Sequence, residues 1–290
     1  MKPAAASVTP PYLLLYEETV RRALLEDLGR AGDLTTDAIV AAGEEAVASM
    51  IARAPGRIAG LEVAVCAFRC LDARVRAEIL VADGSDAPAG EHLAVVSGPA
   101  RAILSAERTA LNFLGRLCGI ATATRGIVAA VAHTGAQVVC TRKTTPGLRS
   151  LEKYAVRAGG GANHRFGLDD AVLIKDNHRL IAGGITEAVR RVRRHAGHMV
   201  KIEVEVDTLV ELEEALGLGV DAILLDNMPV DMLAQGVHLA RGKALTEASG
   251  GITPANAAAI AATGVDLLSV GWLTHSSAAL DVSLDLAIRL

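Results

Sequence analysis

From about residue 135 onward, the chain alternates short apolar runs with amphipathic segments, and this rhythm limits the folds that it can adopt. The apolar runs are QVVCT (137–141), AVLIK (171–175), VKIEVEV (200–206), AILLD (222–226), ALTEAS (244–249) and LLSVG (267–271). Segments between them, such as ITEAVRRVRRH, place apolar residues at helical spacing. The alternation predicts βα units with parallel strands, arranged as an α/β barrel. The runs are fewer than a complete barrel needs, so we expect an incomplete barrel or further short strands around residues 162–166.

The first part of the chain has a different pattern. Residues 12–30 have helical spacing and end near Gly29. Two segments, 48–60 and 76–100, alternate apolar and polar residues between glycines and prolines, which predicts an antiparallel sheet. A helix is expected between them at 61–71. A long helical stretch of small residues follows at 105–132, with an interruption considered near its glycines.

Composition narrows the classes of function. The net charge is −4, so the chain has no overall attraction to DNA or to anionic lipid, and aromatic residues are only 2%, too few for a single-stranded nucleic-acid binder. We find no run long enough for a membrane span, and the N-terminal run has one Lys and several prolines, unlike a signal peptide. Cys66 and Cys70 are expected to pack on one helix face, and a reducing cytoplasm is the expected location.

Positive charge gathers in one stretch of this acidic chain. Residues 141–165 carry six Lys or Arg, one His and a single acid. Strand ends of an α/β barrel surround one mouth, where the chemistry takes place. The cations expected there are Arg142, Lys143, His164, Arg165 and Lys175. They would repel one another without a multiply charged anion, and their chemistry suits carboxylates or phosphates.

For a second set of cations on the same stretch, a solvated surface with salt bridges is the favoured interpretation. These residues, spaced four apart on an expected helix, are Arg149, Lys153 and Arg157.

Carboxylates end two neighbouring runs, at Glu205 and Asp226. An acid pair beside a cationic pocket is typical of Mg²⁺, which commonly arrives with phosphates. Glu203 has the same strand parity as Glu205, so the pattern does not choose between them, and a salt bridge to a lysine is the alternative. No nucleophile with an evident base stands out. The expected chemistry is therefore positioning and charge stabilisation.

Glycines mark a candidate phosphate site after the last two strands. The segment SGGI (249–252) leads into a helix at Thr253-Pro254, which exposes backbone N–H groups to an anion, and Gly271 follows the next run. The segment AGGGANHR (158–165) lacks the ending of a P-loop, so its glycines are expected to give close backbone approach in the floor of the pocket.

Taken together, these segments resemble one family. TRKTTPGLRSLEKYAVRAGGGANHRFGLDDAVLIKDNH, then EVEVDTLVELEEAL, ILLDN, EASGGI and VGWLTHS, are similar to quinolinate phosphoribosyltransferases, and the likeness runs from about residue 17 to the C-terminus. The resemblance implies conversion of quinolinate and phosphoribosyl pyrophosphate to nicotinate mononucleotide, pyrophosphate and CO₂, with Mg²⁺. It also implies an N-terminal α/β sandwich domain at 1–115, rejoined by 275–290, and an incomplete α/β barrel at 116–274.

The resemblance also implies a role for each site residue and a homodimer, in which each sandwich domain caps the partner's barrel. Whether dimers assemble into hexamers stays open. Residues implied to bind quinolinate are Arg142, His164 and Arg165, with Lys143 and Lys175 nearby and Arg108 of the ERT motif reaching across the interface. Thr141 is implied to bind substrate as well. Residues implied to bind Mg²⁺ and the ribose–pyrophosphate are Glu205 and Asp226, and the implied catalytic set is Lys143, Lys175, Glu205 and Asp226. Residues implied to bind the 5′-phosphate are Ser249, Gly250, Gly251, Val270, Gly271 and Trp272.

One residue departs from the family pattern. Trp272 stands where a small residue is usual, and its ring is expected to point away from the phosphate loop. Two alternatives remain. The first is a related enzyme that uses another substrate, either a nicotinate-using one or one associated with molybdate transport. The second is a non-catalytic barrel that senses phosphorylated ligands. An assay for pyrophosphate and CO₂ release separates all three.

Overall fold

The computed structural model describes residues 8–287. The chain forms two compact units, of which the second comprises Gly126–Lys143 and Gly161–Trp272, and the first comprises the remainder. The boundary expected after residue 115 falls inside α4 (Ala100–Val131), which continues unbroken across it. Segment 144–160 belongs to the first unit rather than to the barrel, because its helix α5 (Arg149–Ala158) makes its polar contacts with that unit.

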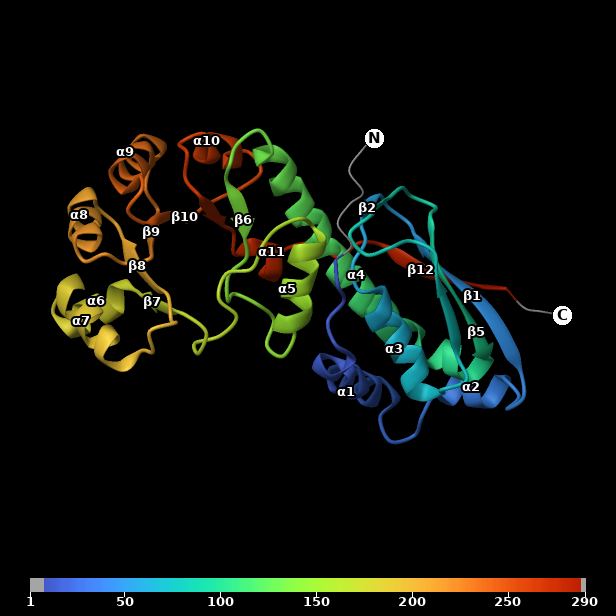
Figure 1. Ribbon diagram of the computed structural model, residues 1–290. Coiled ribbons are helices and arrows are strands. Elements are labelled where there is room, and N and C mark those ends of the chain that lie inside the picture. The colour runs from blue at the N-terminus through green and yellow to red at the C-terminus, as the bar shows by residue number, and fades with distance from the viewer. Residues whose placement is uncertain (1–7, 288–290) are drawn as a thin grey trace. The chain divides into compact units, whose positions relative to one another are not determined.

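The first unit is built on a four-stranded antiparallel sheet. Its order is β12 (Val282–Ala287), β1 (Glu45–Ala52), β5 (His92–Pro99) and β3 (Arg76–Ile79). Helix α3 (Leu61–Leu71) packs against this sheet, and α1 (Glu17–Leu28) packs against α3 (Figure 1). The remaining elements are the 3-10 helix Leu13–Leu15, α2 (Leu34–Ile39) and the strand pair β2 (Gly56–Arg57) and β4 (Asp86–Ala87).

The C-terminal segment returns to the first sheet, where β12 pairs antiparallel with β1. Residues 288–290 of the segment that was expected to return lie outside the described part, as do residues 1–7 of the N-terminal run that was judged unlike a signal peptide. Cys66 and Cys70 lie one turn apart on α3 with their sulfur atoms 3.7 Å apart, and Cys66 is buried.

Glycines allow close packing along α4 and do not interrupt it. A side chain at Gly115 would lie 2.8 Å from the carbonyl oxygen of Leu280, and one at Gly119 would overlap the backbone at Ala278. Among the described residues, this helix alone is long and apolar enough to cross a membrane by length and composition, which the sequence analysis did not expect. Of its most apolar window, 56% is buried inside the protein, as is typical of a core helix.

The second unit is a parallel α/β sheet, as predicted. Its six strands run in the order β6 (Gln137–Val139), β11 (Leu267–Ser269), β10 (Leu245–Ser249), β9 (Ala222–Asp226), β8 (Ile202–Val206) and β7 (Val172–Ile174). Beyond β6, Val139 forms an isolated parallel bridge with Ala162, so a minimal further strand lies in the region where one was expected. This is the incomplete barrel predicted from the spacing.

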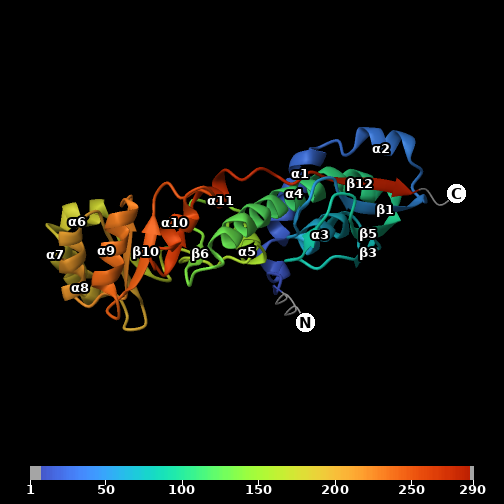
Figure 2. The same ribbon diagram turned by 90° about the horizontal axis from the view of Figure 1, so that it is seen from above.

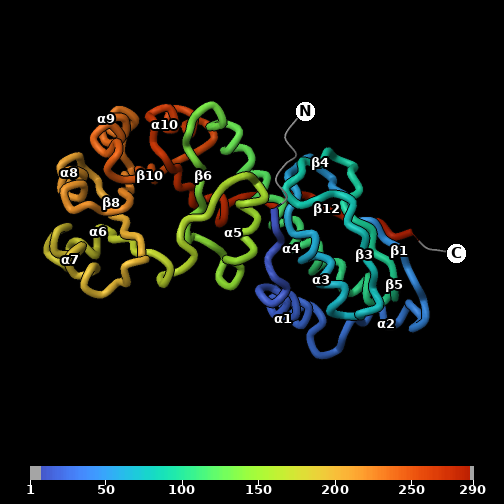
Figure 3. Tube along the Cα trace, viewed as in Figure 1, coloured from blue at the N-terminus to red at the C-terminus, as the bar shows by residue number. Residues whose placement is uncertain are grey.

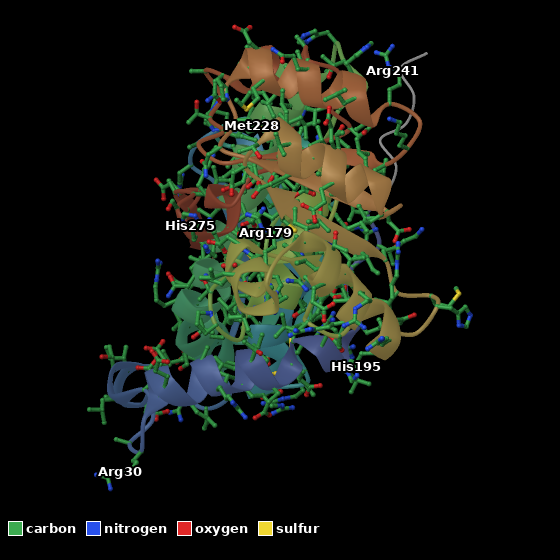
Figure 4. All side chains as sticks on the ribbon, turned by 90° about the vertical axis from the view of Figure 1, so that its left-hand side faces the viewer. Arg30, Arg179, His195, Met228, Arg241 and His275 are labelled. Atoms are coloured by element: carbon green, nitrogen blue, oxygen red, sulfur yellow. The ribbon has the colours of Figure 1, made fainter. Side chains whose placement is uncertain are left out.

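Helices flank this sheet along its outer side (Figures 1 and 2). They are α6 (Asp176–Ala182), α7 (Ile185–His195), α8 (Leu209–Gly217), α9 (Val230–Ala240) and α10 (Ala257–Ala261), and the short α11 (Trp272–His275) follows β11. The trace in Figure 3 shows how each strand returns through a helix to the next strand. Arg179 of α6, labelled in Figure 4, is buried and pairs with Asp207, which precedes α8, and with Glu211 of α8.

One expectation for the basic stretch is wrong. Lys153 of α5 is only 2% exposed, so it does not belong to a solvated surface. Arg157, one turn later, is exposed as expected. The apolar residues of α5 and Lys153 are buried together because nearly the whole helix is enclosed by the first unit.

Candidate active site

The strand register brings the predicted polar ends of the barrel to one edge. Asp226 at the end of β9 stands opposite Ser249 of β10, and Ser249 stands opposite Ser269 of β11. Lys175 directly follows β7, and Glu205 lies near the end of β8. All these strands are parallel, so the residues that follow them lie at the same edge of the sheet, where the strands end.

Two arginines at this edge, Arg142 and Arg165, lie close enough to affect one another electrostatically. The pKa of Arg165 is lowered, first by burial and then by the positive charge of Arg142. The Nε atom of Arg142 is buried and has no hydrogen-bond partner among the described residues. The Nη1 of Arg165 donates a hydrogen bond to the carbonyl oxygen of Ala171 at 2.9 Å, which fixes one end of the guanidinium group. Two guanidinium groups that repel one another favour a ligand with more than one negative charge.

His164 is held by protein atoms on both sides of its ring. The backbone N–H of Arg165 donates to its Nδ1 at 2.8 Å, and its Nε2 lies 2.9 Å from Glu203 and 3.5 Å from Glu247. A backbone N–H can only donate, so Nδ1 carries the lone pair and the neutral ring carries its proton on Nε2. A direct bond from His164 to a substrate would require one of these contacts to be released.

This tautomer argues against a metal at the same place. His164, Glu203 and Glu247 bring three possible ligand atoms within 4.8 Å of one another. A metal on Nε2 would need the proton on Nδ1, where the N–H of Arg165 already points. The three residues therefore form a proton-bearing cluster.

Glu247 is the member of this cluster that the sequence analysis missed. It lies in the middle of β10, is 1% exposed, and neither carboxylate oxygen has a hydrogen-bond partner among the described residues. Burial, reinforced by the charge of Glu203, raises its pKa to about 7. The one available signal was an acid inside an otherwise short buried run, ALTEAS.

The acid pair predicted at the mouth is separate from this cluster. Glu205 lies 3.6 Å from the Nζ of Lys175, and burial raises the pKa of Glu205 although Lys175 opposes the shift. The negative charge of Asp226 raises the pKa further, so the two carboxylates lie near one another. Because Glu203 bonds to His164, the structure distinguishes the two glutamates that strand parity left equivalent.

The motif KDNH positions Lys175. Helix α6, which the sequence analysis did not anticipate, begins at Asp176, and His178 in its first turn accepts the backbone N–H of Lys175 through Nδ1 at 2.9 Å. This contact satisfies one of the free donors at the helix start. It also fixes the point at which Lys175 leaves β7.

The loops after β9 and β10 pack closely together. Asn227 has a positive φ of 51°, its backbone N–H donates to the carbonyl oxygen of Ser249 at 2.9 Å, and its side chain donates to Asp226 at 2.6 Å. Gly250 has a φ of 97°, and any side chain there would overlap the Asn227 side chain. Both residues therefore shape the segment proposed for phosphate, and Asn227 was not predicted.

Trp272 links the loops after β10 and β11. Its indole N–H donates to the carbonyl oxygen of Ile252 at 2.8 Å, which fixes the ring against the loop that contains Gly250 and Gly251. Val270 is buried, and its N–H donates to Val139 of β6 at 2.9 Å. The bulky ring is thus part of the loop framework, and the expectation that it points away from the phosphate loop is wrong.

Other predicted site residues lie as follows. The hydroxyl of Thr141 accepts the backbone N–H of Lys143 at 3.0 Å, and Lys143 is exposed.

Arg108 lies on α4 in the first unit, where its side chain is 63% exposed, 3.6 Å from Glu107. It lines a cavity of about 330 Å³ with Glu26, Asp27 and Arg116. Gly159 allows the close backbone approach that was expected of these glycines, because a side chain there would lie 2.5 Å from the carbonyl oxygen of Ala121 in α4.

Comparisons with family models, curated proteins and solved structures agree on one family. Residues 120–285 match the family model of the quinolinate phosphoribosyl transferase C-terminal domain, and residues 33–118 match that of its N-terminal domain. The chain is 47% identical over 265 residues to a probable nicotinate-nucleotide pyrophosphorylase (carboxylating) of Bacillus subtilis, with 91% of each protein covered. It is 46% identical over 274 residues to the nicotinate-nucleotide pyrophosphorylase (carboxylating) of Mycobacterium leprae, covering 93% of this chain and 96% of the relative. The crystal structure of NadC from Streptococcus pyogenes superimposes with a TM-score of 0.93 at 39% identity, covering 96% and 99% of the two chains.

Proposed function

Because the chain belongs to the quinolinate phosphoribosyl transferase family, we propose that it transfers phosphoribose from phosphoribosyl pyrophosphate to quinolinate and releases pyrophosphate and CO₂. The product is nicotinate mononucleotide, a precursor of NAD. The observation that carries the proposal is the pair of half-buried arginines at the barrel edge, Arg142 and Arg165, where burial and the charge of Arg142 lower the pKa of Arg165. Quinolinate is a planar dianion, and two guanidinium forks match two carboxylates.

The cations bind and orient the aromatic substrate. Arg142 and Arg165 contact its carboxylates, while Lys143 adds positive charge from the loop after β6. His164 fixes the backbone of Arg165 through the bond to Nδ1, so its first contribution is to hold that arginine in place. The result is a pyridine nitrogen held close to the anomeric carbon of the second substrate, within about 3.5 Å.

During the transfer, negative charge develops on the departing pyrophosphate, and the residues at the mouth of the barrel stabilise this charge. The pyridine nitrogen forms its bond to the anomeric carbon as the bond to pyrophosphate breaks, and the electron pair leaves with pyrophosphate. Lys175 lies 3.6 Å from Glu205 and is placed to neutralise the departing oxygens. The carboxylate beside the positively charged ring nitrogen is then lost as CO₂, its electron pair passes to the ring carbon, and a proton from solvent replaces it.

The acid pair fits a divalent cation. Besides burial, the negative charge of Asp226 raises the pKa of Glu205, because the two carboxylates repel one another. The single positive charge of Lys175 does not balance two carboxylates. Oxygen ligands of this kind suit Mg²⁺, which supplies charge neutralisation to the pyrophosphate when bound. Asn227 orients Asp226 through its side-chain amide at 2.6 Å.

The glycine loops after β10 and β11 hold the 5′-phosphate. Gly250 and Gly251 both have positive φ, a backbone conformation that glycine adopts readily and that occurs in anion-binding loops. The indole of Trp272 ties the second loop to the first through Ile252. Ser249 and Gly271 complete this segment.

Arg108 acts across a dimer interface in this proposal. Two inactive variants test it: Arg108→Ala and Arg142→Ala are purified separately, mixed, and allowed to exchange subunits. If Arg108 serves the partner's site, the mixed dimers contain one intact site, and about a quarter of wild-type activity returns. If Arg108 serves its own chain, mixing restores nothing.

The function is tested by pyrophosphate release with each candidate substrate. We expect turnover with quinolinate and none with nicotinate, because a monocarboxylate leaves one arginine unpaired. Glu205→Gln, which keeps the shape of the side chain, is expected to abolish turnover while quinolinate still binds. Equal turnover of both acids would contradict the proposal, and absence of turnover with either would favour a sensor.

A further inference from the structure

Glu152 is the most completely buried acid of the first unit. It lies in α5 with 0% exposure, and its carboxylate accepts bonds from Arg116 of α4 and from Thr145. The distances are 2.8 Å from Arg116 Nη2, 3.0 Å from the backbone N–H of Thr145 and 2.8 Å from its hydroxyl. A buried charge costs much free energy unless such bonds satisfy it, so the carboxylate holds its partners firmly.

Arg116 extends this contact to a second segment of the chain. Besides Glu152, it donates through Nη2 to the carbonyl oxygen of Thr274, and through Nη1 to that of Ser277 at 3.2 Å. One ion pair thus fixes two segments, 144–145 and 274–277. All of these residues belong to the first unit.

Both fixed segments continue directly from loops of the proposed site. Thr145 follows Arg142 and Lys143 after one intervening residue, and Thr274 follows Gly271 and Trp272 in the same way. The strands that precede these loops, β6 and β11, are paired in the parallel sheet. Each loop is therefore joined along the chain to a residue that the Glu152–Arg116 pair holds, Thr145 in one case and Thr274 in the other.

We propose that Glu152 is a positioning residue of the reaction. Through Thr145 it fixes the loop that carries the cations for the dicarboxylate, and through Arg116 it fixes the loop for the 5′-phosphate. The inference rests on the function proposed above. It gives the LEKY portion of the basic stretch a reason to contain a buried acid.

The sharpest test removes one hydroxyl. Thr145→Val keeps the volume of the side chain and loses the hydroxyl bond to Glu152, while the backbone N–H bond stays. Thr145→Ser retains both bonds. We expect Thr145→Val to raise KM for quinolinate about tenfold, with a smaller change in KM for phosphoribosyl pyrophosphate. Thr145→Ser is expected to behave as wild type. Glu152→Gln, where it folds, is expected to raise both KM values.

Tyr154→Phe is the matched control. Tyr154 also lies on α5, and its hydroxyl donates to Asp83 at 2.6 Å in the same unit rather than to Thr145 or Arg116. We expect this variant to lower Tm and to leave both KM values unchanged. A purely structural role for Thr145 would give the same pattern as this control.

Amide hydrogen exchange gives a readout that does not depend on turnover. In Thr145→Val, peptides that cover 141–147 are expected to exchange faster than in wild type, and in Glu152→Gln those that cover 271–277 as well. In Tyr154→Phe both peptides are expected to match wild type. Unchanged exchange and KM values within about twofold of wild type in Thr145→Val would overturn the proposal. Absence of pyrophosphate release from the wild-type chain would instead refute the proposed function and leave the exchange test standing.

Discussion

Replacing Glu247 by Gln should stabilise the protein, and more so as the pH rises. The carboxylate is buried in β10 without a hydrogen-bond partner among the described residues, and Glu203 lies beside it. Its pKa is raised to about 7 from an ordinary 4.5, because burial and the neighbouring acid disfavour its charge. The folded protein therefore binds a proton that the unfolded chain has already released, so stability falls as the pH rises from about 4.5 to about 7.

The size of the effect follows from that difference in pKa. Above pH 7 both states are ionised, and the burial of the charge costs roughly 3 kcal/mol. Gln has the same shape and no charge, so Glu247→Gln removes this cost. We expect a gain in the free energy of unfolding of about 3 kcal/mol at pH 8 and about 1 kcal/mol at pH 5.

The assay is chemical unfolding of wild type and variant in parallel at the two pH values. Glu213→Gln, which alters an exposed carboxylate of α8 in the same unit, controls for the loss of one negative charge. A gain that is the same at pH 5 and pH 8 would refute the reasoning, as would destabilisation at pH 8. The second result would mean that the ionised Glu247 is satisfied by partners such as His164.

Three further variants test the site. Arg142→Ala should cost roughly 2–4 kcal/mol in transition-state binding of quinolinate, measured as kcat/KM, and unchanged turnover would remove Arg142 from the site. Gly250→Ala should destabilise the protein by about 1–3 kcal/mol in urea unfolding, because of its positive φ and the overlap with Asn227. Gly242→Ala, with positive φ but open space around it, should cost less, and equal losses would contradict the overlap. Trp272→Phe loses the bond to Ile252 and should raise KM for phosphoribosyl pyrophosphate about fivefold; an unchanged KM would show that the ring has no part in shaping the loop.

Much of the fold follows from local patterns in the sequence. The helix at 61–71, the strand AILLD and the helices at 185–195 and 230–240 have the bounds that periodicity predicts. The interruption considered in α4 does not occur. Gly115 and Gly119 instead allow residues 278–280, far away in sequence, to approach the helix closely. Periodicity carries no information about such partners.

The site could be predicted in part for a similar reason. Cations and acids at strand ends are visible in the sequence, because strand ends converge in any barrel. Glu247 and Asn227 were missed since their importance arises from register: one stands inside a strand near Glu203, and the other packs against Gly250. The burial of Lys153 was missed because helical spacing of charges looks the same on a buried helix and on an exposed one.

The most direct test of the account follows both products of one reaction. Quinolinate labelled in the carboxyl group next to the ring nitrogen is incubated with phosphoribosyl pyrophosphate and Mg²⁺, and released CO₂ and pyrophosphate are counted together. We predict equal amounts of the two throughout the time course, and neither product from the Arg142→Ala, Arg165→Ala double variant. Pyrophosphate without labelled CO₂, or full release by the double variant, would contradict a site that grips a dicarboxylate through its paired arginines.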